Sequence, residues 1–323
     1  MSDSIVTVDI GGTHARFAIA QVEGGRCAAL GEAVTLHTRD HASFQRAWQE
    51  FERRQGGALP RAVAIAIAGP PRGEVIRFTN NPWIIRPALV GEMLNVDRQL
   101  LVNDFEAVGH AVAQADARYF ERLTGPDEPL PASGTTSVIG PGTGLGVAHV
   151  WRDESDYRVQ ATEGGHIDFA PLDSIEDAIL ARLRARHGRV SVERVVSGPG
   201  IVDIYETLAA MEGLAVAPLD DRAIWTRAMA GEDSLAVAAA DRFCLSLGSV
   251  AGDLALAQGA NGVVVAGGLG LRIRDSLTRS GFPERFIAKG RFGNFMAAIP
   301  VKLITHPQPG LFGAAAAFAR HYG

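Results

Sequence analysis

The chain presents one carboxylate at a position that suits catalysis. Residues 100–102 (Leu-Leu-Val) favour a buried strand, and Asn103 and Asp104 follow it directly. Ligands of open α/β sheets collect beyond the carboxyl ends of the strands, so a carboxylate at this point can face a bound substrate. An apolar helical pattern starts at Phe105, and Asp104 could instead only cap that helix by accepting a backbone N–H. The residues that accompany Asp104 elsewhere in the sequence favour the first role.

Two glycine-rich turns accompany Asp104, one before it and one after it in the chain. Gly11-Gly12-Thr13 lies between two apolar stretches, and the segment from Gly140 to Gly146 lies between two others. Glycine allows φ > 0 and, without a Cβ, lets a bulky anion approach the backbone N–H groups. Either turn alone could be an ordinary hairpin turn. A pair of them around a candidate catalytic carboxylate favours a phosphate-bearing ligand.

Other common phosphate-binding loops are excluded by residue type and spacing. A P-loop needs G-x-x-x-x-G-K-[ST], and neither of the two lysines is placed to complete it. A dinucleotide fingerprint needs G-x-G-x-x-G before a helix. Counting from Gly140 or from Gly142, the third glycine is missing, and a strand pattern follows. The protein-kinase motifs are absent as well, which leaves a pair of glycine hairpins.

A carboxylate and an imidazole, Glu163 and His166, are three positions apart across two glycines. A carboxylate accepts hydrogen bonds from hydroxyl groups, and a neutral imidazole both donates and accepts, so the pair suits a sugar. A single loop histidine is more often structural, whereas this spacing favours binding. Phosphoryl transfer asks a protein mainly to position groups and stabilise charge, and one carboxylate base helps to activate a hydroxyl nucleophile.

Length, charge and cysteine content exclude several classes of protein. The 323 residues suit two domains, and 47% hydrophobic and 21% charged residues are ordinary for a globular protein. A net charge of −5 provides no basic field for nucleic acid or an anionic membrane. Cys27 and Cys244 lack disulfide or zinc-site spacing. No run approaches the ~20 apolar residues of a membrane span, and the start lacks a basic signal-peptide region, so we expect a cytoplasmic protein.

The apolar periodicities predict the elements that must position these residues. Hairpins are expected at residues 5–20 and 136–150, each with a glycine turn at its tip. Because both repeat the order strand, Gly-Thr turn, strand, they suggest an internally duplicated fold. Residues 126–133, rich in Pro, Asp and Glu, are interpreted as a linker and domain boundary. Other expected elements are strands at 62–68, 100–102, 262–266 (ending in a third glycine turn) and 301–304, and helices at 41–54, 174–187, 199–211, 234–259 and 310–320.

The order of these motifs resembles that of bacterial glucokinases along nearly the whole chain. The resemblance implies an α/β protein of the actin-like, ribonuclease-H-like fold, in which two α/β domains with a cleft between them close over ATP and a sugar. It implies a small domain of residues 1–115 with 306–323 and a large domain of residues 116–305. The motifs that carry it are Asp9-Ile-Gly-Gly-Thr13, Asn103-Asp104, Gly142-Thr-Gly-Leu-Gly146, Glu163-Gly-Gly-His166, Glu193 in the stretch 192–200, and Ala266-Gly-Gly268.

The resemblance also implies roles for single residues. Asp104 would be the general base for the 6-hydroxyl of glucose, and the sugar would be bound by Asp104 with Asn80, Asn103, Glu163, His166 and Glu193. ATP would be bound by Asp9, Gly11, Gly12, Thr13, Gly142, Thr143, Gly144, Gly267 and Gly268. Mg²⁺ would be held mostly by the phosphates and water, with Asp9 as a candidate contact and no dedicated metal site in the protein. His14 departs from the family pattern, in which Asn often follows the Gly-Gly-Thr.

Several alternatives stay open from the sequence. The sugar could be mannose, fructose, glucosamine or an N-acetylated sugar, and the donor could be ADP or polyphosphate. A non-enzymatic nucleotide switch or a sugar sensor could use the same fold. The related repressor/kinase group carries a cysteine-rich zinc cluster and a DNA-binding segment. Here no cysteine lies near His166 and only four residues precede Ile5, so the branch without zinc is favoured. The resemblance further implies a homodimer.

Overall fold

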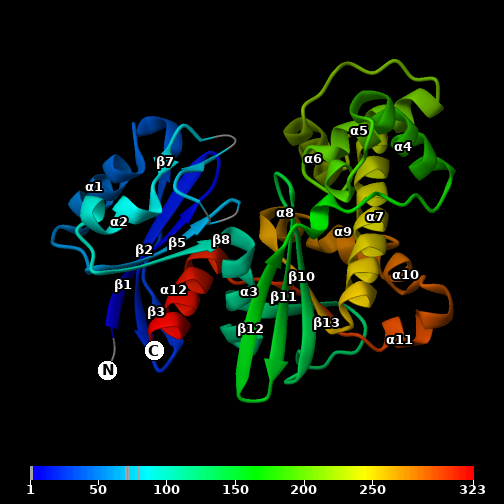
Figure 1. Ribbon diagram of the computed structural model, residues 1–323. Helices are drawn as coiled ribbons and strands as arrows, with labels where there is room; N and C mark the ends of the chain where they lie inside the picture. The colour runs from blue at the N-terminus through cyan, green and yellow to red at the C-terminus, as the bar shows by residue number, and fades with distance from the viewer. Residues whose placement is uncertain (1–2, 70, 72, 79–80) are drawn as a thin grey trace. The chain divides into compact units, whose positions relative to one another are not determined.

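The structure is a computed structural model that describes residues 3–69, 71, 73–78 and 81–323 (Figure 1). The chain divides into two compact units. Unit 1 comprises Met1–Asp116, Val159–Ala161 and His306–Gly323, and unit 2 comprises Ala117–Arg158 and Thr162–Thr305. Each unit is built on its own sheet, with helices beside it. The predicted α/β class is therefore confirmed.

Unit 1 draws its elements from the first part of the chain and from the last helix. They are β1 (Asp3–Ile10), β2 (His14–Glu23), β3 (Arg26–Leu30), β4 (Val34–His37), the 3-10 turn η1 (Thr38–Asp40), α1 (Phe44–Gln55), β5 (Ala62–Ile67), β6 (Ile76–Arg77), β7 (Ile84–Ile85), α2 (Pro87–Leu94), β8 (Arg98–Asn103), α3 (Asp104–Gln114) and α12 (Pro309–Tyr322).

The sheet of unit 1 has the order β3-β2-β1-β5-β8, with β4 beside β2. β1 and β2 form the predicted hairpin, since every residue of β1 has an antiparallel partner in β2. β5 pairs in parallel with β1 on one side and with β8 on the other. The carboxyl ends of these three strands therefore lie along one edge, where ligands of α/β sheets bind.

The two faces of this sheet are covered by side chains of different size. Every residue of β5 is buried, as expected of an apolar strand covered on both faces. Val63, Ile65 and Ile67 form one cluster with the aromatic rings of α1, including Trp48 and Phe51. The alternating alanines of β5 form another cluster with the alanines of α12, which lies against the sheet (Figure 1, red). Small side chains on both elements allow this close packing.

α12 also packs closely on α3, the helix that begins at Asp104. A Cβ on Gly313 of α12 would overlap the carbonyl oxygen of Ala107, so this crossing requires glycine. The hydroxyl of Thr7 in β1 donates to the Leu311 carbonyl oxygen at 2.7 Å. Together these contacts fix the start of α3 relative to the sheet.

Unit 2 contains a second sheet and most of the helices of the chain. Its elements are η2 (Ala117–Tyr119), β9 (Phe120–Thr124), β10 (Gly134–Pro141), β11 (Leu145–Asp153), β12 (Asp156–Thr162), η3 (Gly164–His166), α4 (Ser174–His187), η4 (Val192–Arg194), α5 (Gly200–Met211), α6 (Asp221–Ala230), α7 (Ser234–Gln258), β13 (Ala260–Val265), α8 (Gly267–Arg272), α9 (Arg274–Arg279), α10 (Phe282–Ile287), η5 (Gly290–Phe292), α11 (Gly293–Ala297) and β14 (Val301–Ile304).

The second sheet repeats the topology of the first. Its order is β12-β11-β10-β13-β14, with β9 beyond β14. β10 and β11 form an antiparallel hairpin, and β13 pairs in parallel with β10 and with β14. In each sheet, three strands that are consecutive in the chain are followed by two parallel strands. The internal duplication predicted from the two hairpins is therefore confirmed.

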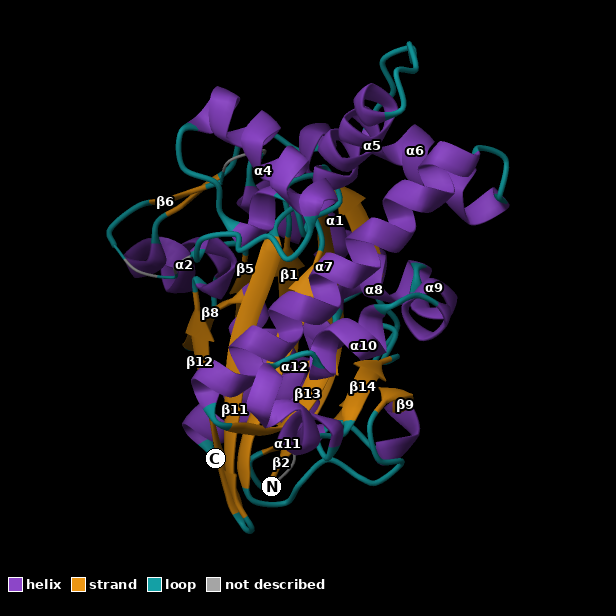
Figure 2. Cartoon of the chain, turned by 90° about the vertical axis from the view of Figure 1, so that its right-hand side faces the viewer, coloured by secondary structure: helices purple, strands orange, loops and turns teal. Residues whose placement is uncertain are grey.

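α7 is the core helix of unit 2 (Figure 2). Among the described residues it is the helix long and apolar enough to cross a membrane, with a mean hydropathy of 1.3 over its most apolar window. However, 72% of that window is buried, in contact with β10 and β13 and with neighbouring helices. The apolar composition of α7 is explained by this burial.

Two sequence interpretations are wrong in detail. Residues 126–133 are not a linker between units, because they connect β9 to β10, which both belong to the sheet of unit 2. The glycines after β13 begin a helix and do not form a third glycine turn, because Gly267 is the first residue of α8. The patterns do not predict α2, α6, α8, α9, α10 and α11; the last four of these helices have five or six residues each and give little periodicity.

We predict that Gly313→Ala lowers the free energy of unfolding by about 1–3 kcal/mol, because the added methyl group forces α12 away from α3. Urea denaturation measures this change. Gly57→Ala is the matched control: an added Cβ there meets no atom within 4 Å, so its effect should stay within about 0.5 kcal/mol. Equal stabilities of the two variants would contradict the close crossing.

Candidate active site

The β1–β2 turn places Gly11, Gly12 and Thr13 at the carboxyl end of β1. The amide of Gly11 closes the turn by donating to the His14 carbonyl oxygen at 2.9 Å. The Nδ1 atom of His14 lies 2.9 Å from the Thr13 hydroxyl oxygen, and its ring contacts that of His37, with 4.5 Å between the ring centroids. The residue that departs from the family pattern therefore contacts the predicted phosphate turn directly.

The pKa of His14 is lowered, first by burial and then by the nearby positive charges of His37, Arg16 and Arg39. A lowered pKa favours the neutral ring at pH 7. A neutral ring can share one proton with the Thr13 hydroxyl, so either group can act as the donor of that hydrogen bond.

Asp9 precedes the turn and faces Arg16 across the hairpin, with 3.0 Å between Oδ2 and Nη1. Burial raises the pKa of Asp9, and the Arg16 guanidinium opposes that rise. A Cβ on Gly310, in the first turn of α12, would stand 2.8 Å from Oδ2. The carboxylate therefore lies against the positive end of a helix dipole as well as a guanidinium, and both favour its charged form.

Asn103 and Asp104 lie where β8 passes into α3, and they have different local roles. Asn103 is the N-cap: its Oδ1 accepts from the amides of Phe105 and Glu106, and Glu106 reaches back to the Asn103 amide in a capping box. Its Nδ2 donates to the Gly69 carbonyl oxygen at 3.2 Å. The alternative that Asp104 is the cap is therefore wrong.

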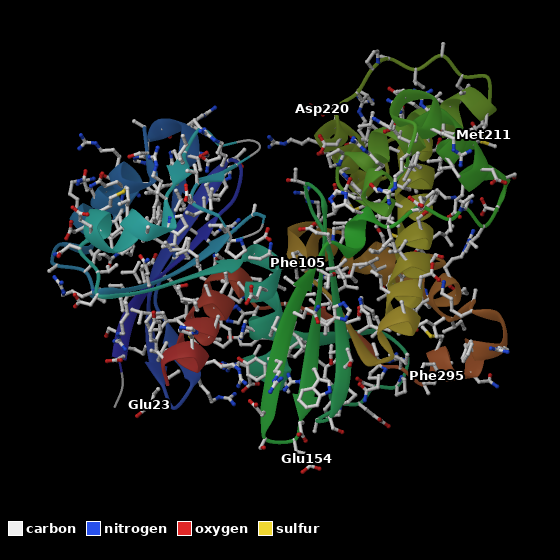
Figure 3. All side chains as sticks on the ribbon, in the orientation of Figure 1. Glu23, Phe105, Glu154, Met211, Asp220 and Phe295 are labelled. Carbon is white, nitrogen blue, oxygen red and sulfur yellow. The ribbon has the colours of Figure 1, made fainter. Side chains whose placement is uncertain are left out.

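Asp104 is the first helical residue of α3 and is half-buried. Its Oδ1 lies 2.9 Å from the amide nitrogen of Phe105, the residue labelled in Figure 3. Since Asn103 already satisfies that amide, the helix does not depend on the Asp104 carboxylate for its cap. Asp104 thus stands at the carboxyl edge of the unit 1 sheet, the same edge at which β1 ends in the glycine turn, with β5 between the two strands.

Asn80, predicted to bind the sugar, lies outside the described residues. The next residue, Asn81, is buried and its Nδ2 donates to the Gly11 carbonyl oxygen at 3.2 Å. The residue that follows the predicted sugar contact therefore contributes its side chain to the glycine turn. Asn81 was missed because two adjacent asparagines in one loop give no periodicity to separate them.

In unit 2, the turn at Gly142 to Gly144 joins β10 to β11. The amide of Leu145 donates to Glu193 Oε2 at 2.8 Å, and a Cβ on Gly144 would overlap that oxygen. Glu193, which the resemblance implies as a sugar contact, is also a fixed part of this turn. It lies in η4 and is about one-third exposed.

The structure brings Glu193 together with Glu163 and His166. His166 Nε2 lies 3.9 Å from Glu163 Oε2 and 4.0 Å from Glu193 Oε1. These distances exceed a hydrogen bond and leave room for polar groups of a ligand to reach all three side chains. Glu163 and His166 are more than half exposed, so they are accessible to a ligand. The predicted carboxylate–imidazole pair is thus a group of three residues.

Two glycines and one arginine bring this group together. Both glycines between Glu163 and His166 pack on β11, and a Cβ on Gly165 would overlap the Leu145 carbonyl oxygen. Arg189 ties the segment to the chain before η4: it donates to the His166 carbonyl oxygen at 2.6 Å and pairs with Asp168. Arg189 was missed because no sequence motif includes it.

Gly267 and Gly268, predicted near the adenosine, lie next to the same turn. Gly267 has φ +89°, and a Cβ there would stand 3.1 Å from the Pro141 carbonyl oxygen at the end of β10. A Cβ on Gly142 or on Gly268 would meet no atom within 4 Å, so the backbone at both positions is accessible to a ligand. Unit 2 therefore collects the second glycine turn, the start of α8 and the Glu193 group at one edge of its sheet.

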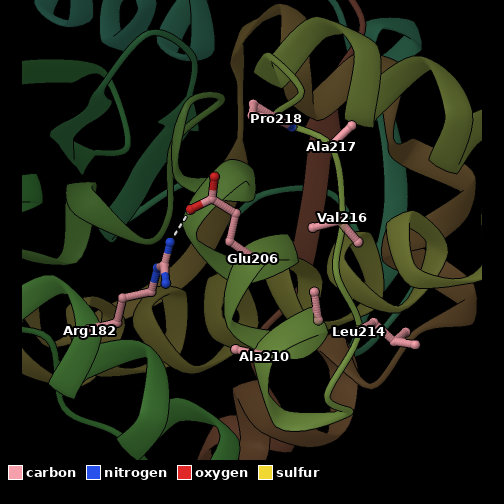
Figure 4. Close-up of a pocket in the computed structure, with 8 residues that line it drawn as sticks. Arg182, Glu206, Ala210, Leu214, Val216, Ala217 and Pro218 are labelled. Carbon is pink, nitrogen blue, oxygen red and sulfur yellow. Dashed lines mark hydrogen bonds and ion pairs between the residues drawn. The ribbon is translucent and has the colours of Figure 1, made fainter.

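A separate pocket of about 270 Å³ lies between α4, α5 and the segment that follows α5 (Figure 4). Its polar side chains, Arg182 and Glu206, form an ion pair with each other, and alanines, Leu214, Val216 and Pro218 line the rest. It contains no group suited to phosphoryl transfer, and none of the predicted site residues lines it. This pocket is therefore not part of the candidate site.

The fold and these edges define a class of protein. Two sheets of the same topology, each with a glycine turn after its first strand, form the actin-like ATPase fold, here with sugar-kinase motifs at both edges. The family whose sequence model matches the chain is Glucokinase, over residues 6–321. The chain belongs to the glucokinase family, and the family and fold implied by the resemblance are confirmed.

Several known proteins are similar along nearly the whole chain, and the last of them shares the fold. The glucokinase of Zymomonas mobilis is 60% identical over 318 residues, which are 98% of each chain. The crystal structure of a glucokinase from an Antarctic psychrotroph is 33% identical, with a TM-score of 0.85 and 98% of each chain covered. A ROK family glucokinase from Streptomyces griseus, solved in complex with glucose and AMPPNP, is 19% identical with a TM-score of 0.62, over 97% of this chain and 98% of its own.

We predict that Gly144→Ala and Gly165→Ala differ in their effect on stability, although the added methyl groups are the same. At Gly144 the methyl group meets the end of a flexible side chain, so Glu193 moves and one charge-assisted hydrogen bond is lost, at about 1.5–3 kcal/mol. At Gly165 it meets the backbone of β11, so the larger loss, above ~3 kcal/mol, is expected there.

Urea denaturation of both variants measures the difference, and a crystal structure of Gly144→Ala should show Glu193 displaced from the Leu145 amide. An undisplaced Glu193, or a greater loss of stability at Gly144, would contradict the assignment of Glu193 as the support of this turn.

Proposed function

We propose that this member of the glucokinase family phosphorylates the 6-hydroxyl of glucose with ATP and that Asp104 is the general base. Family membership over nearly the full chain makes it a glucose kinase. The observation that carries the residue assignments is the group of Glu163, His166 and Glu193. One oxygen of Glu193 holds the glycine turn and the other faces the imidazole, so a single side chain joins the phosphate motif to the sugar motif.

Asp104 would accept the proton of the 6-hydroxyl as that oxygen attacks the γ-phosphorus of ATP. A carboxylate is ionised at neutral pH, and positioned base catalysis typically contributes ~10²–10⁴-fold. Support comes from the position of Asp104 at the carboxyl edge of the sheet and from the capping role of Asn103, which relieves the aspartate of that task. Asn103 would bind a neighbouring sugar hydroxyl through its amide.

Glu163, His166 and Glu193 would bind the remaining hydroxyls of the sugar. Two carboxylates provide acceptors for vicinal hydroxyls, and the imidazole can donate or accept. Asn80 is proposed as a further sugar contact. Glu193, about one-third exposed, is the partly buried member of this group, and a partly buried acceptor that pairs with a substrate hydroxyl discriminates against a sugar without that hydroxyl.

ATP would be bound at the two glycine turns. Gly11, Gly12 and Thr13 would contact the phosphates from one turn, Gly142, Thr143 and Gly144 from the other, and Gly267 and Gly268 would contact the adenosine. The accessible backbone at Gly142 and Gly268 supports this assignment. Mg²⁺ would accompany the phosphates and offset their charge, mostly with water ligands, and Asp9 would hold one of these waters.

Other substrates are tested by a panel of hexoses and donors. A coupled assay with ATP should give the highest kcat/KM for glucose, with mannose, fructose, glucosamine and N-acetylated sugars below it. ADP and polyphosphate should be poor donors. ATP hydrolysis that is independent of any sugar would instead favour a nucleotide switch.

We further propose a cytoplasmic homodimer, to be checked by fractionation and by sedimentation of the purified protein.

We predict that Asp104→Asn lowers kcat by about 10²–10⁴-fold, because the amide cannot take the proton of the hydroxyl. The KM values for glucose and ATP should change much less. The control is Asp177→Asn, which makes the same change on an exposed aspartate in the first turn of α4. Turnover of Asp104→Asn within tenfold of the parent, with an unchanged unfolding transition, would refute the base assignment.

We predict that Glu163→Gln raises the KM for glucose by about tenfold and leaves the KM for ATP within twofold, because a charged acceptor for sugar hydroxyls becomes a neutral one. Initial rates over a matrix of both substrates separate the two constants. Glu154→Gln, at the exposed turn between β11 and β12, is the control. An unchanged KM for glucose would remove Glu163 from the sugar site.

A further inference from the structure

We propose that Thr38 and Asn81 are positioning residues for the phosphate-binding turn at Gly11 to Thr13. They hold the carbonyl oxygens of the turn, and so direct its amide N–H groups toward the phosphates of ATP. We call this pair the brace. The inference rests on the proposed function, since it concerns how this turn receives the nucleotide.

Each of the three carbonyl oxygens of the turn accepts a hydrogen bond from the brace. Asn81 Nδ2 donates to Gly11 O at 3.2 Å. The hydroxyl of Thr38 donates to Gly12 O at 3.0 Å, and the backbone amide of Thr38 donates to Thr13 O, also at 3.0 Å. None of these donors lies in the hairpin itself, so the turn is held from outside.

A hydrogen bond to a carbonyl oxygen also fixes the direction of the N–H group in the same peptide. All peptide bonds of the described chain are trans, so the C=O and the N–H of one peptide point in opposite directions. Holding Gly11 O therefore directs the Gly12 N–H away from Asn81, and holding Gly12 O directs the Thr13 N–H away from Thr38. Within the described part of the chain, neither of these two amides donates to a protein acceptor. Two directed amides without protein partners form an anion-binding concavity.

The brace is itself fixed and buried. Thr38 is 2% and Asn81 6% exposed. Asn81 Oδ1 accepts from the Trp83 amide at 3.0 Å, and the indole N–H of Trp83 donates to the His41 carbonyl oxygen at 2.8 Å. The segments that carry Thr38 and Asn81 are thus tied to each other as well as to the turn. A rigid support keeps the amides aligned before the nucleotide arrives, which lowers the cost of binding.

In the second glycine turn, a carbonyl oxygen is likewise held by a donor from outside its hairpin. Gly142 O accepts from the amide of Gly198, which lies outside the β10–β11 hairpin, at 2.7 Å. A Cβ on Gly198 would stand 3.0 Å from that oxygen, so the approach is close. External donors thus hold carbonyls in both turns of the duplicated fold, which supports a role in the shared task of the turns, phosphate binding.

The test compares Thr38→Val, Thr38→Ser and Thr35→Val. Thr38→Val keeps the size of the side chain and the backbone donor, and removes only the hydroxyl bond to Gly12 O. Thr38→Ser keeps the hydroxyl. Thr35→Val makes the same change on β4, at an exposed position. Asn81→Asp is a second test: it keeps the acceptor for the Trp83 amide and removes the donor to Gly11 O.

We expect Thr38→Val and Asn81→Asp each to raise the KM for ATP about threefold to tenfold, which corresponds to one net hydrogen bond. The KM for glucose should stay within twofold, and Thr38→Ser and Thr35→Val should behave as the parent does. An unchanged KM for ATP in a folded Thr38→Val protein would overturn the proposal. So would an equal rise of both KM values, because that would indicate general loosening.

The parent chain is assayed first, so that the proposed function is judged separately. If it transfers no phosphoryl group from ATP to glucose, the proposed function fails, and the brace is tested by calorimetric titration of pyrophosphate into the same proteins. Binding that Thr38→Val weakens threefold or more, and Thr38→Ser does not, supports the brace. Equal binding by all variants, or no binding by the parent, overturns it.

Discussion

The structure depends on one constraint, the parallel pairing of β5 with β1 and β8 and its repetition by β13 with β10 and β14. Parallel strands end at a common edge, so residues that are about 90 positions apart in the sequence, such as Gly11 and Asn103, lie at the same edge of one sheet. Each such edge offers backbone groups without strand partners, and the polar side chains that follow the strands gather there. The candidate motifs at Gly11–Thr13, Asn103–Asp104 and Gly142–Gly144 therefore each stand at the end of a strand.

The glycines of the turns matter mainly because of what approaches them. Gly144 and Gly165 leave room for Glu193 and for β11, and Gly313 leaves room for α3. These close approaches fix polar groups whose side chains would otherwise be mobile. Glu193 is the clearest case, because its hydrogen bond to the Leu145 amide removes its freedom before any ligand arrives. Fixed charges of this kind need no reorganisation when a substrate binds, which is the condition for electrostatic catalysis.

The sequence was a good guide wherever a pattern is local. The hairpins, the buried strand β5, the core helix α7 and the duplicated order all follow from apolar periodicity and glycine position. It was a poor guide to the short helices α8 to α11 and to the segment 126–133, because composition alone does not distinguish a loop within a unit from a linker between units. The cap at the start of α3 was also ambiguous, since adjacent Asn103 and Asp104 are both good capping residues.

By itself, the sequence determined the class of the protein, its family and the residue types at its motifs, because these depend on side-chain chemistry and on spacing along the chain. Only the tertiary structure decided which partner each group has. In the folded chain Asn103 caps α3, Glu193 supports the second glycine turn, and Thr38 and Asn81 donate to carbonyl oxygens of the first turn. Hydrogen bonds join atoms that are close in space, and no spacing in the sequence records a distance between segments that meet only after folding.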